Sequence, residues 1–223
     1  MSCFDELEKW QQDLISRHVD LVIEANKTTN LTRIDSFDEA MVLHVEDSLS
    51  GLTELNVAPE GQYGDLGSGA GYPGVPLAIA SGRKTMLIDT RKKKMDIVNT
   101  MIETLGIQDQ VTTYAGRAEL LAKTRKGEFS VLTARALSKI SVLMELASPL
   151  LKKNGHLICY KSHVDDQELE DAMRVQPLVG MSLLSDRSFK IGETDRRILV
   201  FKKTGSPRIK LPRQEGQAQN NPL

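Results

Sequence analysis

The residues from Tyr63 to Gly74 have the types and spacing of a loop that binds a nucleotide-type cofactor. They read Tyr-Gly-Asp-Leu-Gly-Ser-Gly-Ala-Gly-Tyr-Pro-Gly, with alternating glycines and a carboxylate, Asp65, at the start. Alternating glycines let a ligand approach bare backbone, and Pro73 and Pro76 suit the first turn of a helix. Because the first N–H groups of a helix are unpaired, they can face that ligand.

Two cofactors fit this loop. Gly69, Gly71 and Gly74 match the dinucleotide fingerprint G-x-G-x-x-G, and Asp89 lies twenty positions after Gly69 as a ribose ligand. Read from Asp65, the same stretch matches D-x-G-x-G-x-G, which is typical of S-adenosylmethionine (SAM) methyltransferases with a Rossmann-like sheet.

The register of the loop favours SAM over NAD. The predicted strand over residues 62–66 is followed directly by Gly67, which makes Gly67 the first glycine of the turn. The third dinucleotide glycine would then fall on Tyr72, whose side chain would crowd a pyrophosphate. SAM has no pyrophosphate, and its cationic sulfonium is compatible with a carboxylate such as Asp65.

Further polar residues stand at the ends of predicted strands, where ligands of open α/β sheets bind. Asp89 can accept hydrogen bonds from both ribose hydroxyls, or can instead cap the helix that follows. The backbone of Ala118 and the side chain of Glu119 can meet an adenine edge. Arg135 can hold a carboxylate, a phosphate or a guanine edge bidentately, or can form an ordinary surface ion pair. Lys161 is a candidate of the same kind.

The groups absent from these strand ends restrict the chemistry. No Asp/Asn-Pro-Pro-aromatic sequence, as used to methylate exocyclic amines, follows the fourth predicted strand, and neither Cys3 nor Cys159 lies there. Guanine N7 already presents a lone pair in the ring plane, so its methylation needs alignment and no general base. A site with Arg135 and no evident base therefore favours ring-nitrogen methylation over hydride transfer.

From residue 62 onward, short apolar runs alternate with helical patterns. Strands are predicted at 62–66, 85–89, 111–114, 129–134 and 156–160, and helices at 75–81, 92–105, 118–123, 140–151 and near 165–175. Asn154-Gly155 reads as the stop signal of the fourth helix. A hairpin over 179–189 and 197–201, turning at 192–195, follows. The order predicts an α/β, Rossmann-like class I SAM-dependent methyltransferase fold with a seven-stranded, mostly parallel sheet.

Three segments are predicted around this sheet. Residues 1–61 form a helical extension, because Leu7, Trp10 and Leu14 begin an amphipathic pattern and a second helix runs from 36 or 38 to about 55. Residues 62–203 form the SAM-binding domain. Residues 204–223 are basic, then Gln/Asn-rich, and are expected to be a flexible tail.

Composition and charge fit a cytoplasmic protein with a nucleic-acid partner. The chain has 223 residues, 40% of them hydrophobic, with no apolar run long enough for a membrane and no secretory signal. Two cysteines and four scattered histidines predict no metal site. Residues 1–61 carry 13 acidic and 4 basic side chains, whereas the remainder carries 17 acidic and 25 basic. The basic clusters at 91–94 and 202–213 favour a phosphate-rich partner, although a solvated helix face and a disordered end would also explain them.

Three stretches of the chain resemble the RsmG/GidB family: residues 26–32 (NKTTNLT), 44–49 (HVEDSL) and 65–79 (DLGSGAGYPGVPLAI). Residues 117–119, 135–136 and 212–213 are similar to further signatures of that family, and the resemblance runs from about residue 20 to the C-terminus. It implies methyl transfer from SAM to N7 of a guanine, usually numbered 527, in 16S rRNA. The substrate would be naked rRNA, the small ribosomal subunit or an assembly intermediate.

The resemblance also implies roles for individual residues. Gly67 and Tyr72 would line the SAM pocket, on a loop that includes Gly69 and Gly71, and Ala118 and Glu119 would lie at the adenine. Asp65 and Asp89 would occupy the family's acidic positions in the loop and at the end of the second strand. Arg135 would lie beside both the cofactor and the target base. Asn30 and His44 would shape the substrate side. The chain departs from the family at Ala25 and Thr29, where aromatics are frequent, and at Ser162, where the family often has glycine. Two alternatives remain: an NAD(P)-linked oxidoreductase, and a SAM-responsive RNA-binding module without catalysis.

Overall fold

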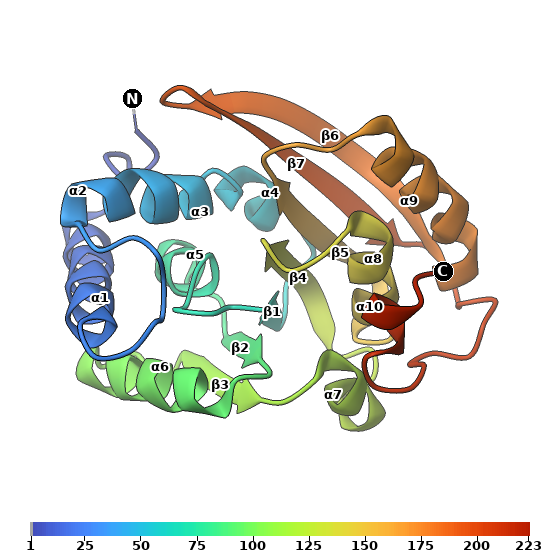
Figure 1. Ribbon diagram of the computed structural model, residues 1–223, viewed down its shortest axis with the longest axis horizontal. Helices are drawn as coiled ribbons and strands as arrows, with labels where there is room; N and C mark the ends of the chain where they lie inside the picture. Colours follow the sequence, from blue (N-terminus) through green and yellow to red (C-terminus); the bar gives the residue numbers. More distant parts are fainter. Residues whose placement is uncertain (1) are drawn as a thin grey trace.

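The computed structural model describes residues 2–223, which fold around one seven-stranded sheet (Figure 1). The strand order is β3-β2-β1-β4-β5-β7-β6. The strands are β1 (Tyr63–Leu66), β2 (Thr85–Asp89), β3 (Val111–Ala115), β4 (Phe129–Arg135), β5 (Leu151–Lys161), β6 (Met181–Ile191) and β7 (Thr194–Lys203). The first five are parallel, and β7 runs antiparallel between β5 and β6. The predicted fold is confirmed, and the order differs from the 3-2-1-4-5-6 order of the dinucleotide fold.

Helices cover both faces of the sheet. On one face lie α1 (Lys9–Asn26), α5 (Gly74–Ser81) and α6 (Lys92–Thr104), and on the other α7 (Ala118–Thr124), α8 (Ile140–Ala147) and α9 (Asp166–Val179) (Figure 1). Every residue of β1 is buried, as are the first six of β4. Strands covered on both faces become continuous apolar runs, which is why their sequence shows no polar alternation.

The N-terminal extension crosses the carboxyl end of the sheet in several short pieces. Residues 37–49 form α2 (Phe37–Ala40), a π-helical segment η1 (Met41–Glu46) and α3 (Asp47–Leu49), and α4 (Leu52–Val57) follows. The single predicted helix is therefore interrupted. At Gly51 a Cβ would lie 2.0 Å from the Tyr160 hydroxyl, so only glycine allows this close approach to β5. A π-helical turn is frequent at functional sites because it changes where side chains point, here around His44.

The predicted end of the fourth helix is wrong. Helix α8 stops at Ala147, and β5 has begun by Leu151, so the Asn154-Gly155 pair lies inside a strand. Pro149 explains the early end, because it has no N–H with which to continue the hydrogen bonding of the helix. Asn154 has a positive φ of 65°, which accommodates an irregularity where the pairing of β4 with β5 shifts register.

The C-terminal segment also differs from expectation. The sequence predicts a flexible tail, whereas the structure packs residues 213–218 against α8. Arg213 forms a bidentate ion pair with Glu145 of α8, at 2.6 and 2.5 Å, and Ala218 is buried in α10 (Gln217–Asn220). The composition of the segment does not predict this packing, because only one buried ion pair and one small apolar residue hold an otherwise polar segment against α8.

Candidate cofactor and target site

The buried side chain of Asp65 supports the glycine loop between β1 and α5. This side chain is fully buried, and its carboxylate accepts hydrogen bonds from the Gly74 amide at 3.0 Å and the Thr133 hydroxyl at 2.7 Å. Burial raises the pKa of Asp65 to about 6, against the opposing effect of these two bonds. Asp65 therefore braces the loop and does not face a ligand directly.

Asp89 ties the same loop to the start of α6. One carboxylate oxygen accepts from the Gly69 amide at 3.1 Å, and the other accepts from the Arg91 amide at 2.9 Å. Gly67 and Gly69 have positive φ values of 73° and 56°, which a side chain would strain. Asp89 contacts the amide of Arg91, the residue just before α6, without capping the helix, and it also borders a cavity next to Gly67.

Two cavities meet at Gly67. The larger, about 700 Å³, falls in the range of about 300–1,000 Å³ for ligand sites. It lies between the glycine loop, the ends of β4 and β5, and the N-terminal extension, and its lining includes Thr32, His44, Asp47, Gly67, Ser68, Gly69, Ala70, Tyr72, Arg135, Lys161 and Arg196. The smaller, about 60 Å³, is bordered by Asp89, Ala118 and Glu119 among others. The structure thus divides most of the predicted site residues between two adjoining spaces, whereas Asp65 and Gly71 border neither.

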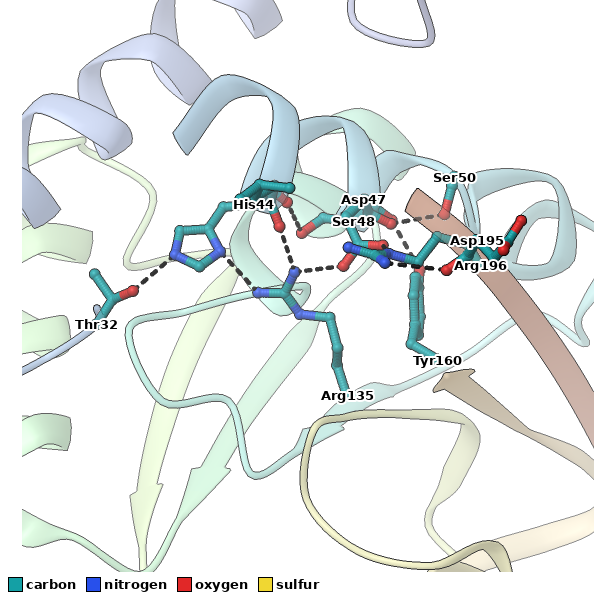
Figure 2. Close-up of polar contacts among 10 residues, drawn as sticks. Thr32, His44, Asp47, Ser48, Ser50, Arg135, Tyr160, Asp195 and Arg196 are labelled. Atoms are coloured by element: carbon teal, nitrogen blue, oxygen red, sulfur yellow. Dashed lines mark hydrogen bonds and ion pairs between the residues drawn. The ribbon is translucent and has the colours of Figure 1, made fainter. Parts of the chain in front are cut away.

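A chain of polar contacts joins residues that line the larger cavity (Figure 2). Arg135, at the end of β4, donates to Asp47 at 2.7 Å and to the Nδ1 atom of His44 at 3.2 Å. The second carboxylate oxygen of Asp47 accepts from Arg196 of β7 at 2.7 Å, and the Nε2 atom of His44 lies 2.9 Å from the Thr32 hydroxyl. These contacts connect the N-terminal extension to two strands of the sheet.

His44 is a neutral ring with both nitrogens engaged. Because Nδ1 accepts from the Arg135 guanidinium, Nε2 carries the proton and donates to Thr32. Burial and then the charge of Arg135 lower the pKa of His44 to about 4. The ring stacks on Tyr72, with centroids 4.5 Å apart, and His18 contacts the other side of Tyr72 at 4.8 Å. His44 is thus a positioning group and has no free nitrogen to act as a base.

Arg135 keeps donors available for a ligand. Its guanidinium has five N–H groups, and three are used on Leu43, His44 and Asp47. The remaining two have no partner within residues 2–223, and the side chain, only 15% exposed, lines the larger cavity. A fixed guanidinium with two open donors can bind a carboxylate, a phosphate or a base edge.

The other predicted residues lie in different places. Gly71 borders neither cavity and instead packs on His18, since a Cβ there would lie 3.0 Å from the His18 ring. Glu119 accepts from the Gly216 amide at 2.8 Å. Asn30 lies in a separate groove, and Lys161 lines the larger cavity while pairing with Glu168 at 2.6 Å.

Sequence reasoning missed Asp47 and Arg196. Asp47 lies in the stretch from His44 to Leu49 that carries the family resemblance, so the sequence did contain a motif that could have identified it. Arg196 had no signal, because a basic residue in a predicted hairpin is ordinary on a surface. The two meet only because the antiparallel β7 runs beside β5 and under the extension.

Metal and membrane features are absent from the part of the chain that is described. Over residues 2–223 no group of His, Cys, Asp and Glu side chains is arranged to hold a metal ion. None of the helices over the same residues combines the length and apolar character needed to cross a membrane.

Comparison with known proteins shows the family of the chain. The family model GidB, described as rRNA small subunit methyltransferase G, matches residues 11–198. The chain is 32% identical over 222 residues to ribosomal RNA small subunit methyltransferase G of Staphylococcus saprophyticus, covering 98% of this chain and 92% of that protein. It is 32% identical to the Streptococcus thermophilus protein of that name, covering 98% and 94%.

Solved structures share the fold at low identity. An O-methyltransferase from Bacillus cereus in complex with SAH has a TM-score of 0.57 at 16% identity, covering 83% of this chain and 90% of that one. The [4+2]-cyclase SpnF has a TM-score of 0.59 at 13% identity, covering 89% and 97%. A cyclase among these neighbours illustrates that the fold alone does not decide the reaction. The sheet order and the family match, not the neighbours' reactions, argue against the oxidoreductase alternative. The chain belongs to the GidB family of rRNA small subunit methyltransferases G.

Proposed function

We propose that this protein transfers a methyl group from SAM to N7 of a guanine in 16S rRNA, the guanine that the family resemblance numbers 527. The observation that carries the proposal is Arg135. Its guanidinium is fixed by three contacts, has two open donors and lines a cavity of about 700 Å³ beside the glycine loop. Its neighbour His44 has both ring nitrogens engaged and is no base, and His163, which also lines the cavity, forms no contact with Arg135; this suits a target atom that already presents a lone pair.

The residues around the two cavities fit SAM. The smaller cavity would take the adenosyl end, with Asp89 at the ribose hydroxyls and Ala118 and Glu119 at the adenine. The loop from Gly67 to Ala70 borders the larger cavity and would take the methionine end. When bound, SAM supplies an electrophilic methyl group on a cationic sulfur.

The protein's own residues would align the target. Arg135 would hold the guanine or an adjoining phosphate with its two open donors, while His44 keeps the guanidinium oriented. Tyr72, stacked on His44 at the cavity wall, restricts where a planar base can lie. Asp47 offsets part of the charge of Arg135 and Arg196, which weakens their repulsion of a cationic sulfur nearby.

A basic groove next to the larger cavity supports RNA as the substrate. The groove encloses about 810 Å³, shares Leu31 and Thr32 with the larger cavity, and is lined by Arg33, Arg91 and Lys94 among others. Within residues 2–223, the side chains of Arg33 and Arg91 form no ion pair. Such cations bind phosphates and release counterions, so RNA affinity should fall steeply with salt.

The test uses methyl-labelled SAM and small ribosomal subunits, assembly intermediates and naked 16S rRNA that lack the modification. Label at N7 of one guanine supports the proposal and identifies the substrate form, whereas label at another atom contradicts the N7 assignment. SAM and RNA binding without transfer to any form would favour the non-catalytic module.

Arg135→Ala examines the role of the arginine separately. It should lower the single-turnover rate by about 100-fold, the usual effect of removing a positioned donor, while RNA affinity changes less. Arg197→Ala is the matched control, because Arg197 is likewise an arginine paired with an aspartate, here Asp186, but it does not line the larger cavity. Equal losses of rate and RNA affinity in Arg135→Ala would contradict its place beside the methyl donor.

A further inference from the structure

The smaller cavity has a wall that comes from the far end of the chain. Gln219 of α10 borders it, opposite the residues that end β1 and β2. Leu137 and Leu146 supply apolar surface, while Asp89, Glu119 and Gln219 supply polar atoms at the rim. Figure 1 shows α10, in red, lying beside α8 and next to α7, so the chain returns to its cofactor site after completing the sheet.

Specific contacts hold this C-terminal wall, residues 213–220, in place. Arg213 pairs bidentately with Glu145, whose side chain is only 3% exposed. The Gly216 amide donates to Glu119 at 2.8 Å, and Ala218 packs beside Val142 and Leu146 of α8. Glu119 thereby connects the C-terminal wall to the helix that would meet the adenine.

The cavity as it stands is too small for an adenosyl group. About 60 Å³ is room for two water molecules at about 30 Å³ each, and cavities that hold ligands begin near about 300 Å³. One or more walls must therefore move when the cofactor binds. The walls formed by β1, β2 and α8 belong to the buried core and cannot move without disrupting it.

Two walls lie outside the main core, although Ala218 of α10 is itself buried against α8. Leu137 follows β4 and is 39% exposed, although it lies against Gly67, where a Cβ would come within 2.8 Å of it. The other is the single-turn helix α10, with Gln219 exposed at the rim. A side chain and a one-turn helix can shift at far lower cost than a strand or a long helix.

We propose that the C-terminal wall is a moving part of the adenosyl site and that Gln219 binds the adenine edge when SAM is present. A glutamine amide offers one acceptor and two donors, which match the N6 and N7 atoms of adenine. Arg213 is a positioning residue, because its ion pair sets where α10 begins. This inference rests on the proposed function, since it assumes that the ligand is SAM.

Calorimetric titration of the full-length protein with SAM, without RNA, tests the part played by Gln219. Gln219→Ala should weaken SAM binding by about three- to tenfold, the effect of one lost hydrogen bond. Gln214→Ala is the matched control, because Gln214 is exposed in the same segment but borders neither cavity, and its Kd should equal that of the wild type. Arg213→Lys, which keeps the charge but loses the bidentate geometry, should weaken binding while RNA affinity stays unchanged.

Hydrogen–deuterium exchange of the unaltered protein tests the movement. Peptides that cover residues 213–223 should exchange more slowly when SAM is added, as should the peptide that contains Leu137. Peptides from β6, on the far edge of the sheet, serve as the internal control.

The outcomes separate the two proposals. If the wild type binds SAM but neither the Kd of Gln219→Ala nor exchange over residues 213–223 changes, the inference is overturned and the proposed function stands. If protection appears without an effect of Gln219→Ala, the wall moves but the assignment of Gln219 is wrong. Failure of the wild type to bind SAM overturns both.

Discussion

Asp65 gives a stability prediction that depends on pH. Its carboxylate is fully buried under the glycine loop, and its pKa in the folded protein is about 6 against an ordinary value of 3.8. Because the folded state holds the proton more tightly than the unfolded state, ionisation of Asp65 lowers the free energy of unfolding. The stabilising effect of the protonated form is complete below pH 3.8 and is lost as pH rises towards and through 6.

The magnitude follows from the difference between the two pKa values. At about 1.36 kcal/mol for each pKa unit, the raised pKa of Asp65 lowers the free energy of unfolding by about 3 kcal/mol at pH 7 and about 0.5 kcal/mol at pH 4, relative to the fully protonated state. Asp65→Asn removes this titration while keeping the shape of the side chain. Its amide oxygen can still accept from Gly74, and its amide nitrogen can donate to Thr133, whose hydroxyl also contacts Tyr63.

The assay is urea unfolding of both proteins between pH 4 and pH 7. The free energy of unfolding of Asp65→Asn, relative to the wild type, should rise by about 2 kcal/mol across this range. Asp20→Asn, the same substitution at an exposed position of α1, is the control for the change of residue type. An offset that is the same at every pH and is added to this rise says nothing about ionisation, whereas a difference that stays flat or falls from pH 4 to pH 7 would refute the reasoning.

Three further predictions concern the loop and the polar chain. Gly74→Ala places a Cβ 2.2 Å from Leu87, so it should lower the free energy of unfolding by about 1–3 kcal/mol and weaken SAM binding; calorimetric values equal to the wild type would contradict this. Tyr160→Phe removes the hydroxyl that donates to the buried Ser48 carbonyl at 2.7 Å and should cost about 1–3 kcal/mol in urea unfolding, an expectation that a loss near zero would exclude. His44, with its pKa lowered to about 4, should stay neutral from about pH 5.5 to 8 and contribute no inflection to the single-turnover rate there; an inflection that disappears in His44→Asn would show that it titrates in this range.

The glycine loop illustrates how much of a local structure can be predicted from residues close together in the sequence. The strand, the positive-φ glycines at 67, 69 and 71, and the helix after them were predictable because each depends on residues within a few positions. The parallel sheet was predictable as well, since alternation of strands and helices leaves few topologies. What the loop residues do was less clear, since Asp65 and Gly71 turned out to support the loop from inside the core.

The polar chain required the tertiary structure. Thr32, His44, Asp47, Arg135 and Arg196 come from four separate parts of the sequence, and nothing in their local patterns pairs them. Burial then determines their chemistry, since the neutral state of His44 depends on its surroundings and on the charge of Arg135.

The two ends of the chain also show the difference between what the sequence determines and what only the tertiary structure decides. By itself the sequence determined the strands, the glycine loop, the family and the strand-end residues, because these depend on periodicity and short motifs. Only the tertiary structure decided that the polar C-terminal segment closes the smaller cavity and that the acidic extension supplies Asp47 to two arginines. Such contacts join residues far apart in the chain, and their strength comes from removal from water, which no local pattern records.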